Sequence, residues 1–242
     1  MVTDIVSNRP NRKIEKWSDL ISELNIDMSK CVNYVTARQI KQITNEEPRL
    51  MAKMDRIENL PIVFRDNNAF LLPVSRREYV IVKGKGYHKL EPITGKPITH
   101  TTRIPFPISA LGSENESVFL EYANSCGLLK RLLSTKSDLI LTFRRRRVTP
   151  NFSFNVSNSK ITVDGAQIEV DAGFESSKEI ILFEAKIGIP SSFNIRQLYY
   201  PYRTLYNIKS VRNFLFCFKP EQKGYLFWEY SLIPMIILNR LI

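Results

Sequence analysis

Two neighbouring segments, residues 167–175 and 180–187, gather carboxylates and a lysine that could do chemistry. The candidate groups are Asp171 in the first segment and Glu184 and Lys186 in the second. Facing carboxylates repel one another unless a proton or a cation lies between them, and one lysine neutralises only part of that charge. A bound divalent metal would resolve the conflict. Oxygen ligands favour Mg²⁺, with Mn²⁺ as a substitute, and Mg²⁺ usually keeps water molecules for chemistry.

A hairpin with a four-residue loop, residues 176–179, would bring these side chains together. It places Asp171 opposite Glu184, and Glu169 opposite Lys186, with Cβ atoms roughly 5 Å apart. A two-residue loop would need a tight turn of two serines, which are poor residues for a type I′ turn. The other face of the hairpin is apolar and is predicted to face the core. That face comprises Ile168, Val170, Ala172, Phe174, Ile181, Phe183, Ala185 and Ile187.

The spacing of these residues resembles the PD-(D/E)XK nuclease motif, with Asp171, twelve residues, and then Glu184-Ala185-Lys186. By this resemblance Asp171 and Glu184 hold the metal, the Ala185 carbonyl assists, and Lys186 orients or activates the attacking water. Val170 stands where the family has a proline. The bare pattern occurs by chance in many chains, so the strand parity and the hairpin carry the argument. An exposed hairpin edge with a Glu–Lys pair is the alternative, but the apolar run before Glu184 argues against it.

The order of elements from residue 113 onward supports the same resemblance. It reads as a helix, three strands in a meander, a helix and a strand, which is similar to the αβββαβ core of that family. We therefore expect an α/β (α+β) fold whose nuclease core, residues 110–242, has a central mixed sheet flanked by helices. Residues 1–109 are predicted to form an accessory region for DNA recognition, with helices followed by short strands. The proline-rich stretch 91–109 marks the boundary.

Local signals place the remaining elements. Trp17, Leu20, Ile21 and Leu24 have helical spacing, and Thr36 with Gln39 forms a capping box. Pro48 is predicted to start a helix with Leu50, Met51 and Met54 inside, followed by strands at residues 62–64, 69–74 and 78–82. Asp164-Gly165 is a hairpin-turn signal, and Ser113 with Glu116 is predicted to cap the helix that Gly127 ends. A helix over residues 195–206 shows an apolar stripe opposite Arg196, Gln197, Tyr200 and Arg203.

Four further residues are accessory candidates for the site. The resemblance implies that the first core helix lends an acidic residue, for which Glu114 and Glu121 are available, and Glu169 lies beside the motif aspartate. Gln197 follows the E-x-K strand and resembles an accessory position that orients water or phosphate. For each of them the alternative is an ordinary exposed residue on a helix or a strand.

The charge balance favours a polyanionic partner. Lys and Arg outnumber Asp and Glu by 35 to 24, which gives a net charge of +11 and a pI near 9.6. Four consecutive arginines, Arg144, Arg145, Arg146 and Arg147, are predicted to lie on an exposed loop or edge that contacts DNA. Lys83 and Lys85, in a glycine-rich basic loop, are predicted to contact phosphate, with a solvated hairpin tip as the alternative. Charge alone does not choose among DNA, RNA and an anionic membrane. The carboxylate cluster and the nuclease resemblance make double-stranded DNA the expected partner.

The sequence suggests a reducing compartment. Cys31, Cys126 and Cys217 have no paired spacing, and no apolar run reaches the length of a membrane span. We expect a cytoplasmic protein with neither membrane association nor a small-molecule cofactor. The leading hypothesis is a Mg²⁺-dependent type II restriction endonuclease that works as a homodimer on palindromic DNA. A structure-selective repair or junction nuclease and a non-cleaving DNA-binding regulator are the alternatives.

Overall fold

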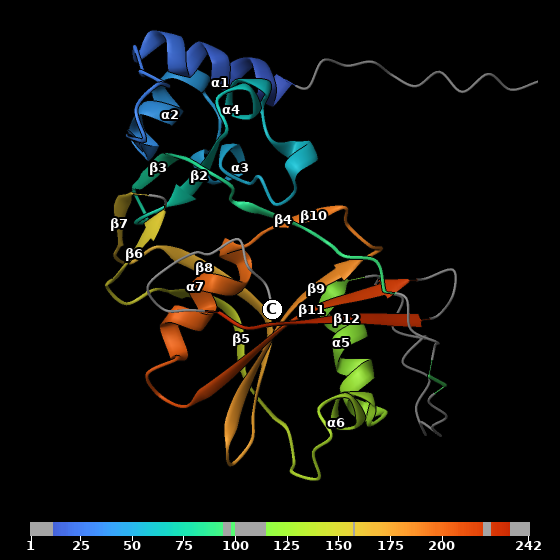
Figure 1. Ribbon diagram of the computed structural model, residues 1–242. Helices are drawn as coiled ribbons and strands as arrows, with labels where there is room; N and C mark the ends of the chain where they lie inside the picture. Colours follow the sequence, from blue (N-terminus) through green and yellow to red (C-terminus); the bar gives the residue numbers. More distant parts are fainter. Residues whose placement is uncertain (1–11, 94–97, 100–114, 157, 220–223, 233–242) are drawn as a thin grey trace, which may run out of the picture.

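The computed structural model describes residues 12–93, 98–99, 115–156, 158–219 and 224–232. Within these residues the chain is a mixed α+β protein that comprises two parts (Figure 1). The N-terminal module, residues 12–83, contains small helices and a three-stranded sheet. The sheet module, residues 115–232, is built around a five-stranded sheet. The predicted boundary near residue 109 lies outside the described residues.

Short helices pack against one sheet in the N-terminal module, whose strand order is β1-β3-β2. The capping box of Thr36 and Gln39 is confirmed at the start of α2. Residues 62–64 form a helix and not the predicted strand, because Pro61 precedes them and Phe64 packs edge-on to Trp17, with ring centroids 5.1 Å apart. The elements are α1 (Arg12–Glu23), β1 (Val32–Thr36), α2 (Ala37–Thr44), α3 (Pro48–Met51), η1 (Ile57–Asn59), α4 (Ile62–Asp66), β2 (Ala69–Pro73) and β3 (Glu78–Lys83).

The central sheet has the strand order β12-β11-β9-β8-β5, and only the β11–β9 pair is parallel. Strand β11 lies inside the sheet, between β12 on one side and β9 on the other. The elements are α5 (Glu116–Ser125), α6 (Leu128–Leu132), β5 (Ile140–Val148), β6 (Phe152–Val156), β7 (Ser159–Val163), β8 (Gln167–Glu175), β9 (Glu179–Ile187), β10 (Ser192–Asn194), α7 (Arg196–Leu205), β11 (Ser210–Lys219) and β12 (Gly224–Tyr230).

Helices cover both faces of this sheet. Helices α5 and α6 lie on one face with Phe183 and Phe214 in the core between, and α7 lies on the other face (Figure 1). The polar face predicted for α7 is wrong in part, because Tyr200 is fully buried and only 7% of Arg203 is exposed. Arg203 stacks over the ring of Phe152, 4.5 Å from its centroid, so α7 is enclosed on both sides.

The predicted hairpin of β8 and β9 is confirmed in register at its loop end. Glu175 pairs with Ile180, and the ladder continues to Ala172 opposite Phe183. The Asp164-Gly165 turn does not close a hairpin, because β7 pairs with β6 and not with β8. The β6–β7 hairpin is therefore an insertion between two neighbouring strands of the central sheet.

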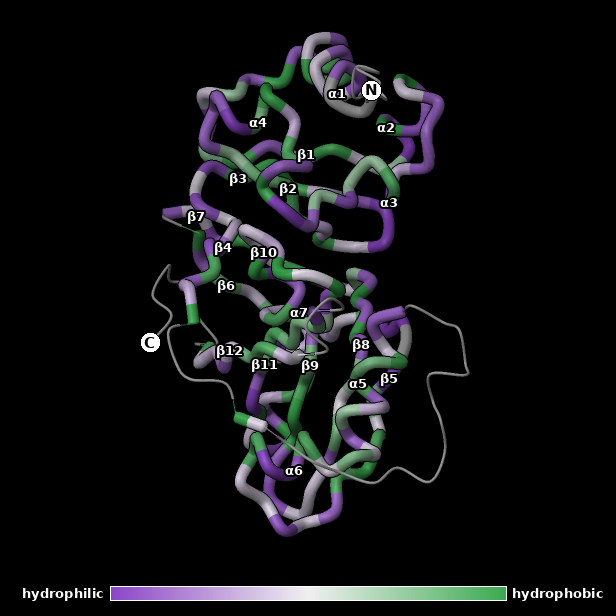
Figure 2. The backbone as a smooth tube through the Cα atoms, turned by 90° about the vertical axis from the view of Figure 1, so that its right-hand side faces the viewer, coloured by the Kyte–Doolittle hydropathy of each residue, from purple (hydrophilic) through white to green (hydrophobic). Residues whose placement is uncertain are grey.

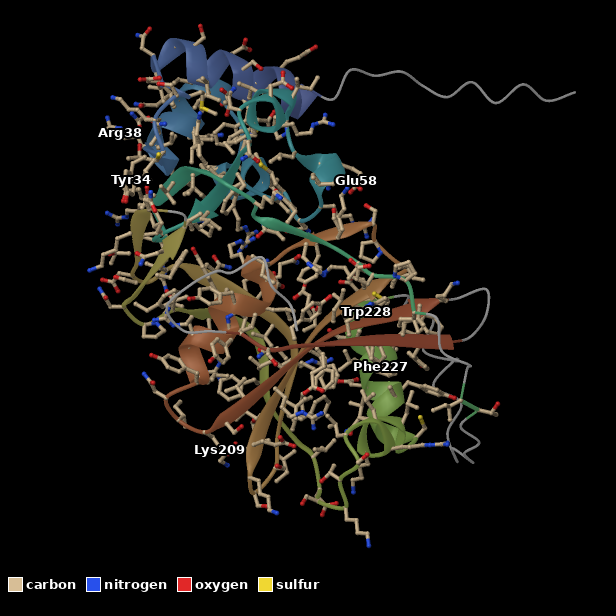
Figure 3. The ribbon with its side chains drawn as sticks, in the orientation of Figure 1. Tyr34, Arg38, Glu58, Lys209, Phe227 and Trp228 are labelled. Carbon is tan, nitrogen blue, oxygen red and sulfur yellow. The ribbon has the colours of Figure 1, made fainter. Side chains whose placement is uncertain are left out.

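A shared hydrophobic core and a small antiparallel pair join the two modules: strands β2 and β3 pack with β6, β7 and α7 in one core cluster. Strand β4 (Tyr87–Lys89), which follows the N-terminal module, pairs with β10 next to α7. The backbone oxygen of Asp55 accepts a hydrogen bond from the Asn194 backbone N–H at 2.8 Å, and Ser191 donates to Glu58, which Figure 3 labels at this junction. The hydropathy view in Figure 2 shows the same two-part arrangement after a quarter turn.

Candidate active site

The two strands that carry the motif separate at Asp171. The register between β5 and β8 changes by one residue between the Phe143–Gly173 and Arg145–Val170 pairs, so β8 bulges here. A bulge re-aims the side chains around it. One carboxylate oxygen of Asp171 then accepts the Ala185 backbone N–H at 2.7 Å. The side chain thus takes the place that a backbone carbonyl would hold in a continuous ladder.

The bulge also corrects two predictions about the hairpin. Val170 packs with Leu182 and α7, whereas Ala172 packs on the opposite face with α5, so the predicted apolar face is not continuous. Glu169 lies opposite Arg146 of β5 and not opposite Lys186. Its carboxylate is 3.9 Å from the Arg146 guanidinium and stays on the exposed edge.

Glu184 and Lys186 form a buried ion pair on β9. They are 6% and 8% exposed, and the ammonium of Lys186 donates both to Glu184 and, at 3.0 Å, to the Ala185 carbonyl. The side-chain N–H of Gln197, from α7, donates to the same Glu184 oxygen. The Oε1 atom of Gln197 is buried and accepts no hydrogen bond from any described residue. Gln197 therefore presents an unused acceptor beside the buried pair.

Glu116 is the acidic residue that α5 brings to this site. Its carboxylate accepts a hydrogen bond from the Ile187 backbone, two residues beyond the N–H that Asp171 accepts. The helix begins one residue after Asn115, whose side chain accepts the Val118 N–H at 3.0 Å. The predicted cap at Ser113 is therefore replaced by Asn115, and Glu116 is the first helical residue, free to point into the site.

Burial makes these acids hard to ionise. It raises the pKa of Glu184 to about 8, and it raises the pKa values of Asp171 and Glu116 although Lys186 opposes the rise in each case. Burial by itself would lower the pKa of Lys186, but the three carboxylates around it raise that pKa above its ordinary value. Three carboxylates and one ammonium carry a net charge of −2 when all four are ionised.

We expect the stability of the metal-free protein to fall as the pH rises from about 4.3, the usual pKa of an unfolded glutamate, through about 8. The folded state binds a proton at Glu184 in this window that the unfolded state has released. One such proton changes the unfolding free energy by about 1.4 kcal/mol per pH unit. Urea unfolding across this window would measure the slope, which Glu184→Gln should reduce. An unchanged slope in Glu184→Gln, or an equal reduction in Glu175→Gln, would contradict the assignment.

The site opens into a cleft of about 1120 Å³ between the two modules. Asp171, Glu184 and Lys186 line it together with Glu116 and Gln197. On the other side, residues of α3 and of the turn between β2 and β3 line the same cleft. The catalytic candidates therefore face a space that is large enough for a polymeric substrate to enter.

The predicted DNA-contact residues are distributed differently from the expectation. The arginine run belongs to the edge strand β5 and not to a loop, and Arg146 and Arg147 line the cleft. Arg144 pairs with Glu121, which places that acid outside the site. Lys83 ends β3 and Lys85 follows it, and neither lysine lines the cleft. The Arg145 side chain and the whole of Glu114 lie outside the described residues.

The oxygen donors of the site suit a hard divalent cation. Asp171, Glu184 and the Ala185 carbonyl supply oxygen atoms, and the excess charge of −2 matches the charge of such an ion. In the described ranges, no three His, Cys, Asp or Glu side chains gather closely enough to hold an ion by themselves. Mg²⁺ tolerates this arrangement because it usually binds one or two carboxylates and completes its shell with water.

Sequence reasoning missed two residues that the fold adds to the cleft. Asp55 comes from the N-terminal module, and its carboxylate lies 3.9 Å from the Arg196 guanidinium of α7. The Nε atom of Arg196 is buried and makes no hydrogen bond to any described residue. No local sequence pattern marks Asp55 as a site residue. The Arg196-Gln197 pair, with its two long polar side chains after a buried strand, was the available clue.

These observations define the chain as an α+β protein with an acidic, lysine-containing site at the base of a cleft between modules. Residues 82–236, more than half of the chain, match the family described as Domain of unknown function (DUF6997), and the chain belongs to that family. Residues 14–81 match Domain of unknown function (DUF6996). Comparisons with curated proteins and with solved structures found no match. No helix in the described ranges has the length and apolar character needed to cross a membrane.

Proposed function

We propose that this chain is a Mg²⁺-dependent endodeoxyribonuclease with a PD-(D/E)XK-like core, most similar to a type II restriction enzyme. The observation that carries the proposal is the meeting of Asp171, Glu184 and Lys186 with Glu116 where β8 and β9 separate. The order α5, β5, β8, β9, α7, β11 supports it, because it follows the αβββαβ order once α6, the β6–β7 hairpin and β10 are set aside as insertions.

Asp171, Glu184 and the Ala185 carbonyl would hold the cation, with Glu116 close enough to contribute through water. When bound, Mg²⁺ would polarise the scissile phosphate and lower the pKa of a bound water. Lys186 must leave the Ala185 carbonyl to make room, and its ammonium would then donate to the phosphate oxygens and offset their developing charge.

Gln197 gains a specific role in this scheme. Its amide N–H is fixed by Glu184, and its Oε1 atom is buried without a partner among the described residues, so this atom would accept a hydrogen bond from the attacking water once the site opens to admit it. Gln197 would thus orient the nucleophile without taking up its proton.

Two copies of the chain would cut both strands of a palindromic site, since a two-fold axis relates the strands of such a site. A reducing compartment such as the cytoplasm suits the three cysteines, which form no disulfide. Mn²⁺ should substitute for Mg²⁺ because it accepts the same oxygen ligands.

One gel tests the proposal. Incubating plasmid DNA with the protein and Mg²⁺ should give discrete bands, and EDTA should prevent them. Cutting confined to branched substrates would favour a structure-selective repair or junction nuclease on the same core. Binding without any cutting would leave a DNA-binding regulator in which the acidic cluster is structural, and the nuclease assignment would be wrong.

A further inference from the structure

We propose that the N-terminal module forms the second wall of the substrate cleft, and that the substrate is a DNA duplex gripped between two rows of cationic side chains. The inference deepens the proposed function and rests on it, because it concerns the substrate of the same site. It assigns contacts to Arg49, Lys53 and Arg76. None of the three carried a functional signal in the sequence.

The first row lies on the N-terminal module. Arg49 belongs to α3, Lys53 follows that helix, and Arg76 lies in the turn between β2 and β3. All three are exposed and line the cleft. Helix α3 lies on the side of its module that faces the sheet module in both Figure 1 and Figure 2. These cations therefore point toward the space in front of the carboxylates.

The second row lies on the sheet module. Arg146 and Arg147 of β5 are exposed on the opposite wall, and Arg196 of α7 lies deeper. Between the two rows, Glu184 is buried and Asp171 and Glu116 are half-buried. The cations of each row outnumber the acids beside them, which are Glu47 and Asp55 on the first wall and Glu169 on the second, so the cleft is positive at its walls and negative at its base. A single strand has one phosphate backbone and would need one row. Two rows on facing walls fit the two backbones of a duplex, each of which attracts Lys and Arg.

The first wall is held firmly in place. The segment after α3 is pinned by the hydrogen bond of Asn194 to the Asp55 backbone and by the Tyr87 hydroxyl, which donates to the Met54 carbonyl at 2.8 Å. Leu50 is 57% exposed at the same wall, although the sequence predicted it to be inside. A fixed wall with an exposed apolar side chain suits close contact with a groove rather than a loose electrostatic attraction.

The test compares two triple variants that remove the same charge from the same module. Arg49→Gln/Lys53→Gln/Arg76→Gln changes the cleft wall. Lys30→Gln/Arg65→Gln/Arg77→Gln changes exposed residues that do not line the cleft, and Arg77 is the direct neighbour of Arg76. Binding to a short duplex and to its single strand would be followed by fluorescence anisotropy over a range of KCl concentrations, with Ca²⁺ in place of Mg²⁺ to prevent cutting.

The cleft variant should bind the duplex at least about tenfold more weakly at roughly 100 mM salt, and its log–log salt slope should fall by roughly 2 to 3. The control should stay within about twofold of the wild type. Equal losses in both variants, no loss in either, or a loss for the single strand alone would overturn the inference. Failure of the proposed function gives a different result. If the wild-type protein binds duplex DNA but does not cut it with Mg²⁺, the nuclease assignment is wrong, whereas the proposed role of the N-terminal module in DNA binding still stands. A wild-type protein that binds no DNA refutes both.

Discussion

Replacing Glu184 by glutamine is expected to lower the rate of Mg²⁺-dependent cleavage by at least about 10³-fold, or about 4 kcal/mol of transition-state free energy. The change removes one carboxylate charge from the proposed metal ligands but keeps the shape of the side chain and its ability to accept from Lys186 and Gln197. The fold should survive for this reason. Asp171→Asn should have a comparable effect, because its neutral oxygen still accepts the Ala185 N–H but binds a cation weakly.

Glu175→Gln is the matched control. It lies on the same hairpin but at the loop end, where it pairs with Lys209, and it should cut DNA at the wild-type rate. Single-turnover cleavage of a labelled duplex would measure all three rates, and anisotropy with Ca²⁺ would show that the variants still bind. Full activity in either Asp171→Asn or Glu184→Gln would remove that residue from the proposed mechanism.

Lys186→Ala should damage both activity and stability. Cleavage should fall by at least about 10²-fold, because no ammonium then offsets the charge on the phosphate. Above pH 8 the unfolding free energy should fall by up to about 3–5 kcal/mol, because Glu184 without Lys186 either stays ionised with no partner or binds a proton that the unfolded state has released. At lower pH the loss should shrink, since Glu184 then takes up a proton. Urea unfolding at pH 6 and pH 9 would separate the two regimes.

Two comparisons make the Lys186 result interpretable. Adding Glu184→Gln to Lys186→Ala should restore most of the stability at pH 9 without restoring cleavage, because it removes the unpaired charge. Lys209→Ala, which breaks the partly exposed pair at the other end of the hairpin, should cost less than about 1 kcal/mol. Figure 3 shows Lys209 far from the N-terminal module. An equal cost for both lysines would mean that burial does not govern the pair.

The hairpin could be predicted because two independent signals agreed. Alternation along residues 167–175 and the length of the loop both required Glu175 to face Ile180, and the structure has this pair. The bulge at Asp171 could not be read in the same way. It arises from the pairing of β8 with β5, a strand more than twenty residues earlier in the chain, and no local pattern in β8 reports its partner's register.

The position of the helix N-cap determines whether the Glu116 side chain can reach the site. With Ser113 as the cap, Glu116 becomes the third helical residue and its side chain is used by the capping box. With Asn115 as the cap, which the structure has, the same side chain is released toward Asp171. The sequence allowed both caps. The arginine run gave a similar ambiguity, because an edge strand and an exposed loop both tolerate consecutive arginines.

The two family matches meet between residues 81 and 82, which is inside β3. This strand is the middle of its sheet, and Val82, for example, pairs with Val32 on one side and with Phe70 on the other. A chain that ended at residue 81 would lose Val82 and Lys83, the last two residues of this central strand, with the pairs that they make. We therefore expect recombination at that point to give chains that fold poorly. The two domains should accordingly occur together in one gene.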